Sequence, residues 1–332
     1  MTWRHIMFAV DLSSAVSPGV LSKVAHLAHS FDAEVELCHC VFDWHPVRAG
    51  RRIGSVRSGQ EIRAIVARSK QQLDLVARRL SEAGVRARTA VRWDYPAYEG
   101  IIRQVLRHKP DVLIAQTTRH TRPERLMLTH TDYKLIEACP CPLLLIKSNR
   151  PYIDTCIVAA VDPMHTHDRP AALDHAILES ASALSQGIGV ALHVYNARAP
   201  WAEAVQHSPV LRSLPEAVYA EVYAAYEGNA AARVKELARF HKIANSRVHL
   251  AWGDPSEGLP EFANSVSAGV VAMGAVSRSA VQRAFIGHTA ERVLDALSCD
   301  VLVVKPPGFR SPVGRESVHR LPKGLPGAKY VW

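Results

Sequence analysis

The stretch 273–294, "MGAVSRSAVQRAFIGHTAERVL", carries the residues best suited to chemistry. Gly274 follows an apolar run, and Gly287 precedes a helical pattern with Val293 and Leu294 on one face. A phosphate group needs backbone N–H groups that can approach it closely, and glycine permits that approach. A helix N-terminus adds further N–H groups and a favourable dipole. The pattern fits a phosphate-binding loop, and it also fits a tight connection between a strand and a helix.

Histidines and cysteines offer a second kind of chemistry. The segment "DPMHTHD" places His165, His167 and Asp168 just after Asp162, and such a group can bind zinc or a similar ion. Histidines on exposed loops are common in a chain that has 17 of them, so we predict no metal site here.

Two Cys-x-Cys pairs, "CHC" at 38–40 and "CPC" at 139–141, lie in or beside expected strands. Structural zinc sites favour Cys-x2-4-Cys on turns, so we interpret these cysteines as small buried apolar residues.

Signature motifs of enzymes are missing from the sequence. It has no Gly-x4-Gly-Lys-Ser/Thr loop, no Gly-x-Ser-x-Gly elbow and no His-Glu-x-x-His. We therefore predict a protein that is not an enzyme and assign no catalytic residue. A slow ATP-hydrolysing activity stays open as an alternative.

The composition is that of an ordinary globular chain. With 332 residues, 48% hydrophobic and 21% charged, the length favours two domains of about 150 residues each. No apolar run approaches the roughly 18 residues that span a bilayer, and the start "MTWRHIMFAVD" lacks the features of a signal peptide. We expect a cytoplasmic protein that makes no use of a membrane.

The formal net charge of +9 comes partly from a basic tail after Pro306. A basic balance can indicate nucleic acid, but the sequence has no helix-turn-helix, zinc finger or aromatic RNA-binding signature beside it. We predict a solvated basic surface and no nucleic-acid partner.

The chain repeats itself. Each half starts with a short apolar run ending in aspartate: "HIMFAVDLSS" with Asp11, and "CIVAAVDPMH" with Asp162. A helical pattern follows each run; the first begins behind Ser17-Pro18, and Gly187 is the expected stop of the second.

The alignment of the two halves continues to their ends. Three matched pairs stand 158 positions apart: Gln116 with Gly274, Thr129 with Gly287, and Lys147 with Lys305.

Strands that alternate with helices imply a parallel sheet covered on both faces. We predict an α/β fold with two tandem, doubly wound, Rossmann-like domains of five strands each. The expected boundaries are 1–148 for the first domain, 154–306 for the second, and 307–332 for an irregular basic tail.

The motifs of the second half resemble those of the universal stress protein (UspA) superfamily. Its nucleotide-binding members carry Gly-x2-Gly-x9-Gly-Ser/Thr after the fourth strand, and here Gly274, Ser277, Gly287 and His288 stand at that spacing. The aspartate that closes the first strand and the "AERVL" helix agree with the family as well. The tandem arrangement is similar to the UspE type, with an adenine nucleotide alpha hydrolase-like fold.

The resemblance implies an adenine nucleotide such as ATP in the second half, with Mg²⁺ as an accompanying ion. Asp162 and Pro163 would lie near the ribose and adenine, and Met273 and Gly274 near the ribose and phosphates. The residues implied around the phosphates are Val276, Ser277, Gly287, His288, Thr289 and Ala290. Ser277 replaces a motif glycine, and His288 replaces a small hydroxyl residue. A site that has lost the nucleotide, or takes another ligand, stays open.

The first half departs further from the motif. Its matching segment, "AQTTRHTRPERLMLTHTDYKLI", contains no glycine, and Gln116, Arg119 and Thr129 replace the three motif glycines. We predict that this half does not bind ATP in the manner of the family.

The family implies a stress-response or signalling protein that senses a ligand. It also implies that the two halves form an internal pseudo-dimer, and two chains could form a homodimer. The alternative is a binding module for a small, lipid-like molecule with a partner-binding role. The protein partners are not readable from the sequence.

Overall fold

The computed structural model of the chain describes residues 2–43, 55–117, 128–163, 172–198, 215–275 and 287–316. These residues fall into two compact units. The first-half unit contains the described residues up to Pro151 together with 309–316, and the second-half unit contains those from Tyr152 to Gly308. Each unit is one α/β sandwich and is considered by itself below.

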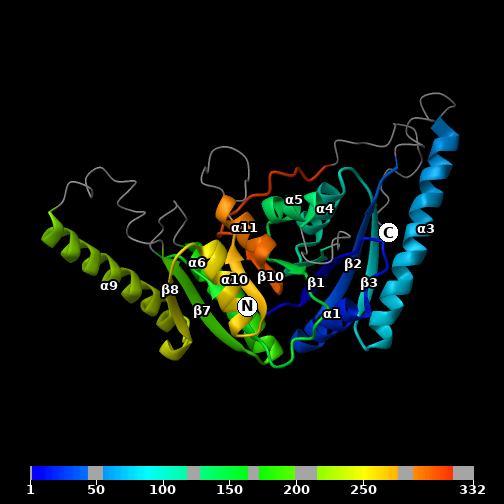
Figure 1. Cartoon of the computed structure of the whole chain (residues 1–332). Coiled ribbons are helices and arrows are strands. Elements are labelled where there is room, and N and C mark those ends of the chain that lie inside the picture. The colour runs from blue at the N-terminus through cyan, green and yellow to red at the C-terminus, as the bar shows by residue number, and fades with distance from the viewer. Residues whose placement is uncertain are drawn as a thin grey trace. The chain divides into compact units, whose positions relative to one another are not determined.

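The first-half unit alternates strands with helices. Its elements are β1 (His5–Ala9), α1 (Pro18–Phe31), β2 (Glu34–Val41), α3 (Ser55–Glu82), β3 (Ala87–Trp93), α4 (Ala97–His108), β4 (Val112–Gln116), α5 (His130–Ala138) and β5 (Leu143–Ile146). The strand order is β3-β2-β1-β4-β5, and all of these pairings are parallel. Figure 1 shows the long helix α3 alongside β2 and β3.

The second-half unit repeats this plan. Its elements are β6 (Cys156–Ala160), α6 (Ala172–Ile188), β7 (Ala191–Arg198), α9 (Glu216–Phe240), the 3-10 turn η1 (Asn245–Arg247), β8 (Val248–Trp252), α10 (Pro255–Ser265), β9 (Ala268–Gly274), α11 (His288–Ala296) and β10 (Asp300–Val304). The strand order is β10-β9-β6-β7-β8, again with parallel pairs.

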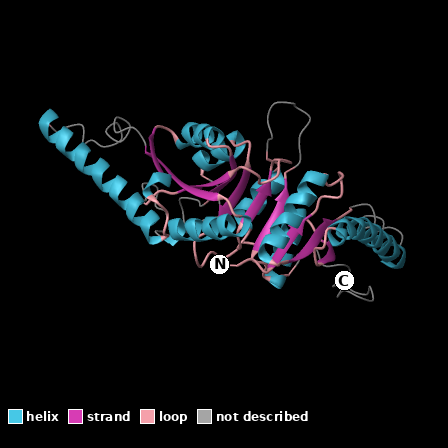
Figure 2. Cartoon of the chain, turned by 90° about the horizontal axis from the view of Figure 1, so that it is seen from below, coloured by secondary structure: helices cyan, strands magenta, loops and turns pink. Residues whose placement is uncertain are grey.

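The direction of the crossovers decides which face each helix covers. From β6 the chain moves outward to β7 and β8, and then returns past β6 to β9 and β10. Because parallel crossovers are right-handed, α6 and α9 cover one face of this sheet and α10 and α11 cover the other. In Figure 2 the magenta strands lie between cyan helices. The crossover direction reverses between β6 and β9, and in the first half it reverses between β1 and β4.

The cores explain the sequence pattern. Strands β4, β5, β6 and β10 are short runs of Val, Leu, Ile, Ala and Cys, apart from Gln116 at the end of β4 and Asp300 at the start of β10, and nearly all of their residues are buried. Such runs are buried on both sides by the helices, so they lack the alternation of a half-exposed strand. The predicted α/β class, with two doubly wound sheets of five parallel strands, is confirmed.

Helix boundaries follow the expected chemistry with one correction. Ser17 caps α1, and its hydroxyl accepts the Val20 N–H at 3.3 Å, as the Ser-Pro signal predicted. The predicted stop at Gly187 was wrong, because α6 continues to Ile188. The helix ends where Gly189 adopts a φ of +71°, which glycine tolerates without a Cβ clash.

A buried arginine of the first-half unit forms a hydrogen bond with the last described segment of the chain. Arg103 on α4 is 4% exposed and forms ion pairs with Asp94, at 2.7 Å, and with Glu99. Its Nε–H also donates to the carbonyl of Gly314 at 3.2 Å. The segment 309–316 thus belongs structurally to the half of the chain that is made first.

Candidate ligand site at the carboxyl edge of the second half

The predicted site residues that the structure describes gather at one edge of the second sheet. Asp162 and Pro163 follow β6, Met273 and Gly274 end β9, and Gly287 precedes α11. Because β6 and β9 are neighbours at which the crossover direction reverses, their carboxyl ends flank the crevice where open α/β sheets bind ligands. Asp162 is half-buried, whereas Pro163 and Met273 are buried.

Gly274 has a packing reason to be glycine. A Cβ at this position would lie 2.6 Å from Leu173 Cδ2 and 3.3 Å from Ile177 Cδ1, both on α6. The sequence suggested a phosphate or a tight strand-to-helix connection as the reason for this residue, but close contact between α6 and β9 is sufficient to require it.

Gly287 differs from Gly274 in this respect. It is the N-cap of α11 with φ −66° and ψ 145°, which any residue adopts, and a Cβ there would meet nothing within 4 Å. Neither backbone strain nor packing among the described residues demands glycine at position 287.

The N-cap residue of α11, Gly287, has no side chain with which to cap the helix, and among the described residues no side-chain cap is formed. The first intrahelical bond runs from the Glu291 N–H to the Gly287 carbonyl at 3.0 Å, so the N–H groups of positions 288–290 lie ahead of the helical ladder. Ala290 is buried and Thr289 is half-buried. This helix end offers backbone donors and a positive dipole end to an anion.

In the first half, the corresponding helix N-terminus, that of α5, is capped by side chains of its own first turn. Thr129 caps α5: its hydroxyl accepts the Asp132 N–H at 3.1 Å, and the Asp132 carboxylate accepts the Thr129 N–H at 2.8 Å. Asp132 is buried, with 4% of its surface exposed. This capping box occupies two donors and places a negative charge where a phosphate would need a positive field.

A lysine holds the start of the connection after β9. Lys305 follows β10, and its ammonium donates to the carbonyl of Ala275 at 2.6 Å. The sequence comparison of the two halves singled out this lysine, but nothing in it indicated the carbonyl that the lysine would bind.

Several predicted residues cannot be placed. Val276 and Ser277 lie outside the described residues, as do His165, His167 and Asp168 and, in the first half, Arg119. For His288 the structure describes the backbone, as the first residue of α11, and not the side chain.

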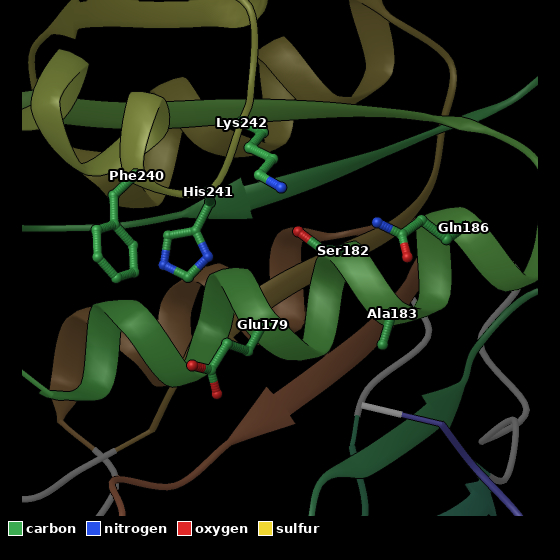
Figure 3. Close-up of a pocket in the computed structure, with 7 residues that line it drawn as sticks. All are labelled: Glu179, Ser182, Ala183, Gln186, Phe240, His241 and Lys242. Carbon is green, nitrogen blue, oxygen red and sulfur yellow. The ribbon is translucent and has the colours of Figure 1, made fainter.

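A cavity of the second-half unit lies away from this edge. It has a volume of about 260 Å³ and opens between α6 and the end of α9 (Figure 3). Its lining comprises Glu179, Ser182, Ala183, Gln186, Phe240, His241 and Lys242. Since α6 returns from the carboxyl edge and α9 leads into β8, the cavity lies toward the amino edge of the sheet. It is therefore separate from the crevice beside Asp162.

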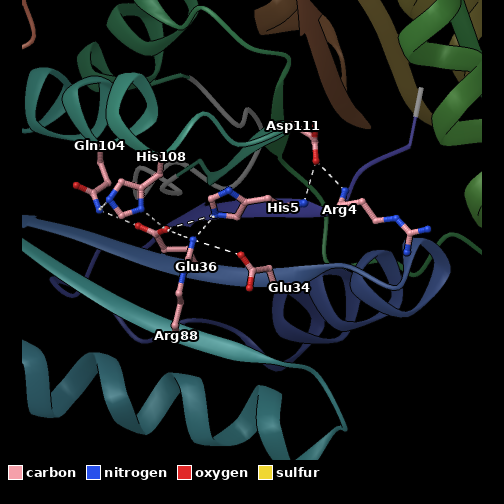
Figure 4. A network of polar contacts seen from close by, with 8 residues as sticks. All are labelled: Arg4, His5, Glu34, Glu36, Arg88, Gln104, His108 and Asp111. Atoms are coloured by element: carbon pink, nitrogen blue, oxygen red, sulfur yellow. Dashed lines mark hydrogen bonds and ion pairs between the residues drawn. The ribbon is translucent and has the colours of Figure 1, made fainter.

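The first-half unit has a buried polar network at its own amino edge (Figure 4). Glu36 on β2 is 1% exposed and contacts His108 Nδ1 at 2.7 Å and Arg88 Nη2 at 2.8 Å. His5 and Gln104 complete the network. Burial raises the pKa of Glu36, but hydrogen bonds from His5, Gln104 and His108 outweigh burial and lower the pKa to about 2. This carboxylate is a structural anion rather than a proton donor.

The described part of the chain contains no assembled metal-binding site. No group of three or more His, Cys, Asp or Glu side chains there could hold a metal ion.

The six cysteines are free thiols. Cys38 lies in β2, and Cys139 directly follows α5, with its sulfur 3.6 Å from that of Cys141. Burial raises the pKa of Cys38 to about 12, so this thiol is protonated at neutral pH.

Comparison with known proteins agrees with the repeat. The model of the universal stress protein family matches residues 2–147 and again 156–305. The chain belongs to the universal stress protein family. Universal stress protein E of Escherichia coli K12 is 29% identical over 238 residues, which are 70% of this chain and 72% of the relative. The protein of the same name from Photorhabdus laumondii is 28% identical over 236 residues, 70% of this chain and 73% of the relative.

Solved structures share the fold of the whole tandem chain. A functionally unknown protein of Pseudomonas aeruginosa PAO1 superimposes with a TM-score of 0.68 at 23% identity, covering 92% of this chain and 93% of that one. A universal stress protein of Archaeoglobus fulgidus gives a TM-score of 0.60 at 17% identity, with coverages of 91% and 98%. None of the helices in the described segments is long and apolar enough to cross a membrane.

Proposed function

We propose that the second half of this universal stress protein binds an adenine nucleotide of the ATP type at the carboxyl edge of its sheet. The phosphates would lie against the N-terminus of α11, with Gly287, His288, Thr289 and Ala290 around them. The base and ribose would lie toward Asp162, Pro163 and Met273. Val276 and Ser277 belong to this proposal on the strength of the sequence motif alone, and Mg²⁺ would accompany the nucleotide.

The observation that carries the proposal is the contrast between two matched helices. Helix α11 begins at a glycine that neither φ nor packing among the described residues requires, and this N-cap residue offers no side-chain cap. The matched helix α5 is closed by a capping box with a buried carboxylate. A fold that retains an uncapped helix end at a topological switch point is suited to receive an anion there.

The proposed role is that of a cytoplasmic stress-response protein that senses the nucleotide rather than converting it. Ligand binding would alter a surface that partner proteins recognise.

Isothermal titration of ATP into the wild type and into Ser277→Gly tests the proposal. Binding by both proteins supports a working nucleotide site. Binding by Ser277→Gly alone would show a nucleotide pocket that no longer takes its ligand in the natural chain. If neither protein binds ATP, the proposal is overturned and another small ligand is favoured. Native mass spectrometry of freshly purified protein would detect such a ligand as a bound mass.

A further inference from the structure

At the carboxyl edge of the second sheet, one peptide unit has both its carbonyl and its N–H group hydrogen-bonded to a side chain. The carbonyl of Val161 accepts a hydrogen bond from Asn196 Nδ2 at 2.8 Å, and the N–H of Asp162 donates to Asp174 Oδ1 at 3.0 Å. These two groups belong to the same peptide bond. Asn196 comes from β7 and Asp174 from the first turn of α6, so two separate elements fix one peptide plane.

Both side chains are buried, each with 3% of its surface exposed. A buried carboxylate costs several kcal/mol of solvation unless hydrogen bonds and local fields compensate it. At Asp174 the compensation includes the Asp162 N–H and the positive end of the α6 dipole. The peptide lies just beyond β6, where the Val161 N–H still bonds to the Tyr195 carbonyl at 3.0 Å. Together these contacts fix the plane of the peptide that leads into Asp162, and so the position of the Asp162 Cα beyond the strand.

The first half holds the corresponding peptide differently. Val10 donates its N–H to the Cys38 carbonyl, as Val161 does to Tyr195, so His39 takes the place of Asn196. His39 Nδ1–H donates to the Val10 carbonyl at 2.8 Å. Asp11 is exposed, and its carboxylate accepts the N–H of Ser13, within its own loop, at 2.9 Å.

We propose that Asp174 and Asn196 are positioning residues for the ligand site. They clamp the Val161–Asp162 peptide and thereby direct the Asp162 carboxylate over the edge where the ligand binds. The proposal rests on the proposed function, because it assigns Asp162 to a ligand. The clamp itself exists without ligand, and it can therefore be tested separately.

The first experiment needs no ligand. Amide hydrogen exchange by NMR is compared in the wild type, Asp174→Ala and Asn196→Ala. We expect Asp174→Ala to speed exchange of the Asp162 amide at least tenfold, while the amides of β9 stay protected. Tyr152→Phe is the matched control, because it removes another buried hydrogen bond of the same unit, the 2.7 Å contact with Asp300. Unchanged exchange at Asp162 in Asp174→Ala would overturn the clamp.

The second experiment asks whether the clamp acts through Asp162. ATP affinity is measured for Asp162→Ala, Asp174→Ala and the double variant. A positioning role predicts that Asp174→Ala weakens binding about tenfold in the natural background and has no further effect once Asp162 is alanine. Equal losses in both backgrounds would overturn the proposal, because the effect would then be structural.

Further variants distinguish the loss of one hydrogen bond from misfolding of the protein. Asp174→Asn keeps an oxygen that can accept the Asp162 N–H, so we expect it to restore most of the affinity lost in Asp174→Ala. If Asp174→Ala does not fold, Asn196→Ala provides the same cycle from the carbonyl side of the peptide. Absence of ATP binding by the wild type would defeat the proposed function, and the exchange experiment would still decide the clamp.

Discussion

Helices α5 and α11 occupy the same place in the two halves, yet their N-termini are opposites. In α5 the Thr129 hydroxyl and the Asp132 carboxylate accept hydrogen bonds from two backbone N–H groups of the helix end. Helix α11 begins at Gly287, and no side chain of the described residues caps it. The comparison teaches that one fold can keep its scaffold in both copies while only one copy leaves backbone donors available to a ligand. A few residues at the helix start carry the difference.

Moving the first-half cap into the second half is the strongest test of this comparison. Gly287→Thr combined with Ala290→Asp reproduces the Thr129 and Asp132 arrangement. We expect ATP binding to fall below detection by titration calorimetry, since the new carboxylate repels phosphate. Helix stability should rise by only a few tenths of a kcal/mol, because threonine is about as good an N-cap residue as the glycine it replaces. Gly287→Thr alone is the control for bulk, and undiminished binding by the double variant would contradict the comparison.

The amino edges of the two sheets differ as well. Glu36 on β2 and His193 on β7 occupy matched positions, since Met7 pairs with Glu36 as Val158 pairs with His193. Glu36 is enclosed by Arg88 and two histidines, whereas His193 Nδ1 lies 2.9 Å from His249 Nε2. We expect Glu36→Gln to lower the free energy of unfolding of the first half by about 2 kcal/mol, because half-exposed Arg88 and the two histidines lose a buried, charged hydrogen-bond acceptor.

Urea denaturation of Glu36→Gln at pH 7 measures this loss. Replacing exposed Glu34, which pairs with the same Arg88 at 3.3 Å, by glutamine is the matched control and should cost less than 1 kcal/mol. Equal effects of the two substitutions would contradict the central role of Glu36.

The two motif glycines should respond differently to alanine. Gly274→Ala pushes against Leu173 and Ile177 and is expected to destabilise the second half by about 1–2 kcal/mol. Gly287→Ala meets open space and should change stability by less than about 0.5 kcal/mol. Thermal unfolding of both variants checks the stabilities. A larger loss of stability for Gly287→Ala would show that its role is structural after all.

Mild acid should affect the second half first. Burial lowers the pKa of His193, His241 and His249, and in the first half it lowers the pKa of His39. The folded state therefore takes up fewer protons than the unfolded chain, and stability falls as the pH drops below about 6.5. The lowered pKa of Glu36 acts later, with stability lost between its ordinary range and about pH 2.

Hydrogen exchange by mass spectrometry, corrected for intrinsic rates, can follow each half between pH 7 and pH 5. We expect a few-fold loss of protection in β7 and β8 and a smaller loss in β1 and β2. The variant with His193→Asn and His249→Gln should flatten the response of β7 and β8. An unchanged pH dependence in that variant would exclude the imidazole pair as its source.

The sequence predicted the architecture well, because short apolar runs, helical periodicity and the internal repeat are local signals. The sequence also predicted that Asp162, Gly274 and Gly287 lie at one edge of the sheet. This was possible because all strands of a doubly wound sheet are parallel, so the residues that follow them lie at the same edge. It missed the reason for Gly274, which depends on how closely α6 approaches β9. It could not find Asp174 and Asn196, whose contacts join elements far apart in the chain. The helix cap of α5 was readable in principle, because Thr129 and Asp132 have the spacing of a capping box.

The contact between Arg103 and Gly314 joins residues 211 positions apart. During translation the first-half sheet and its helices leave the ribosome long before Gly314 is made. At about 5–20 residues per second, Arg103 waits on the order of 10–40 s for that carbonyl. In the interval its Nε–H can bond only to water or to another transient acceptor. The first half of the chain thus emerges before the second half, yet its hydrogen bond between Arg103 and Gly314 can form only after the second half has been made.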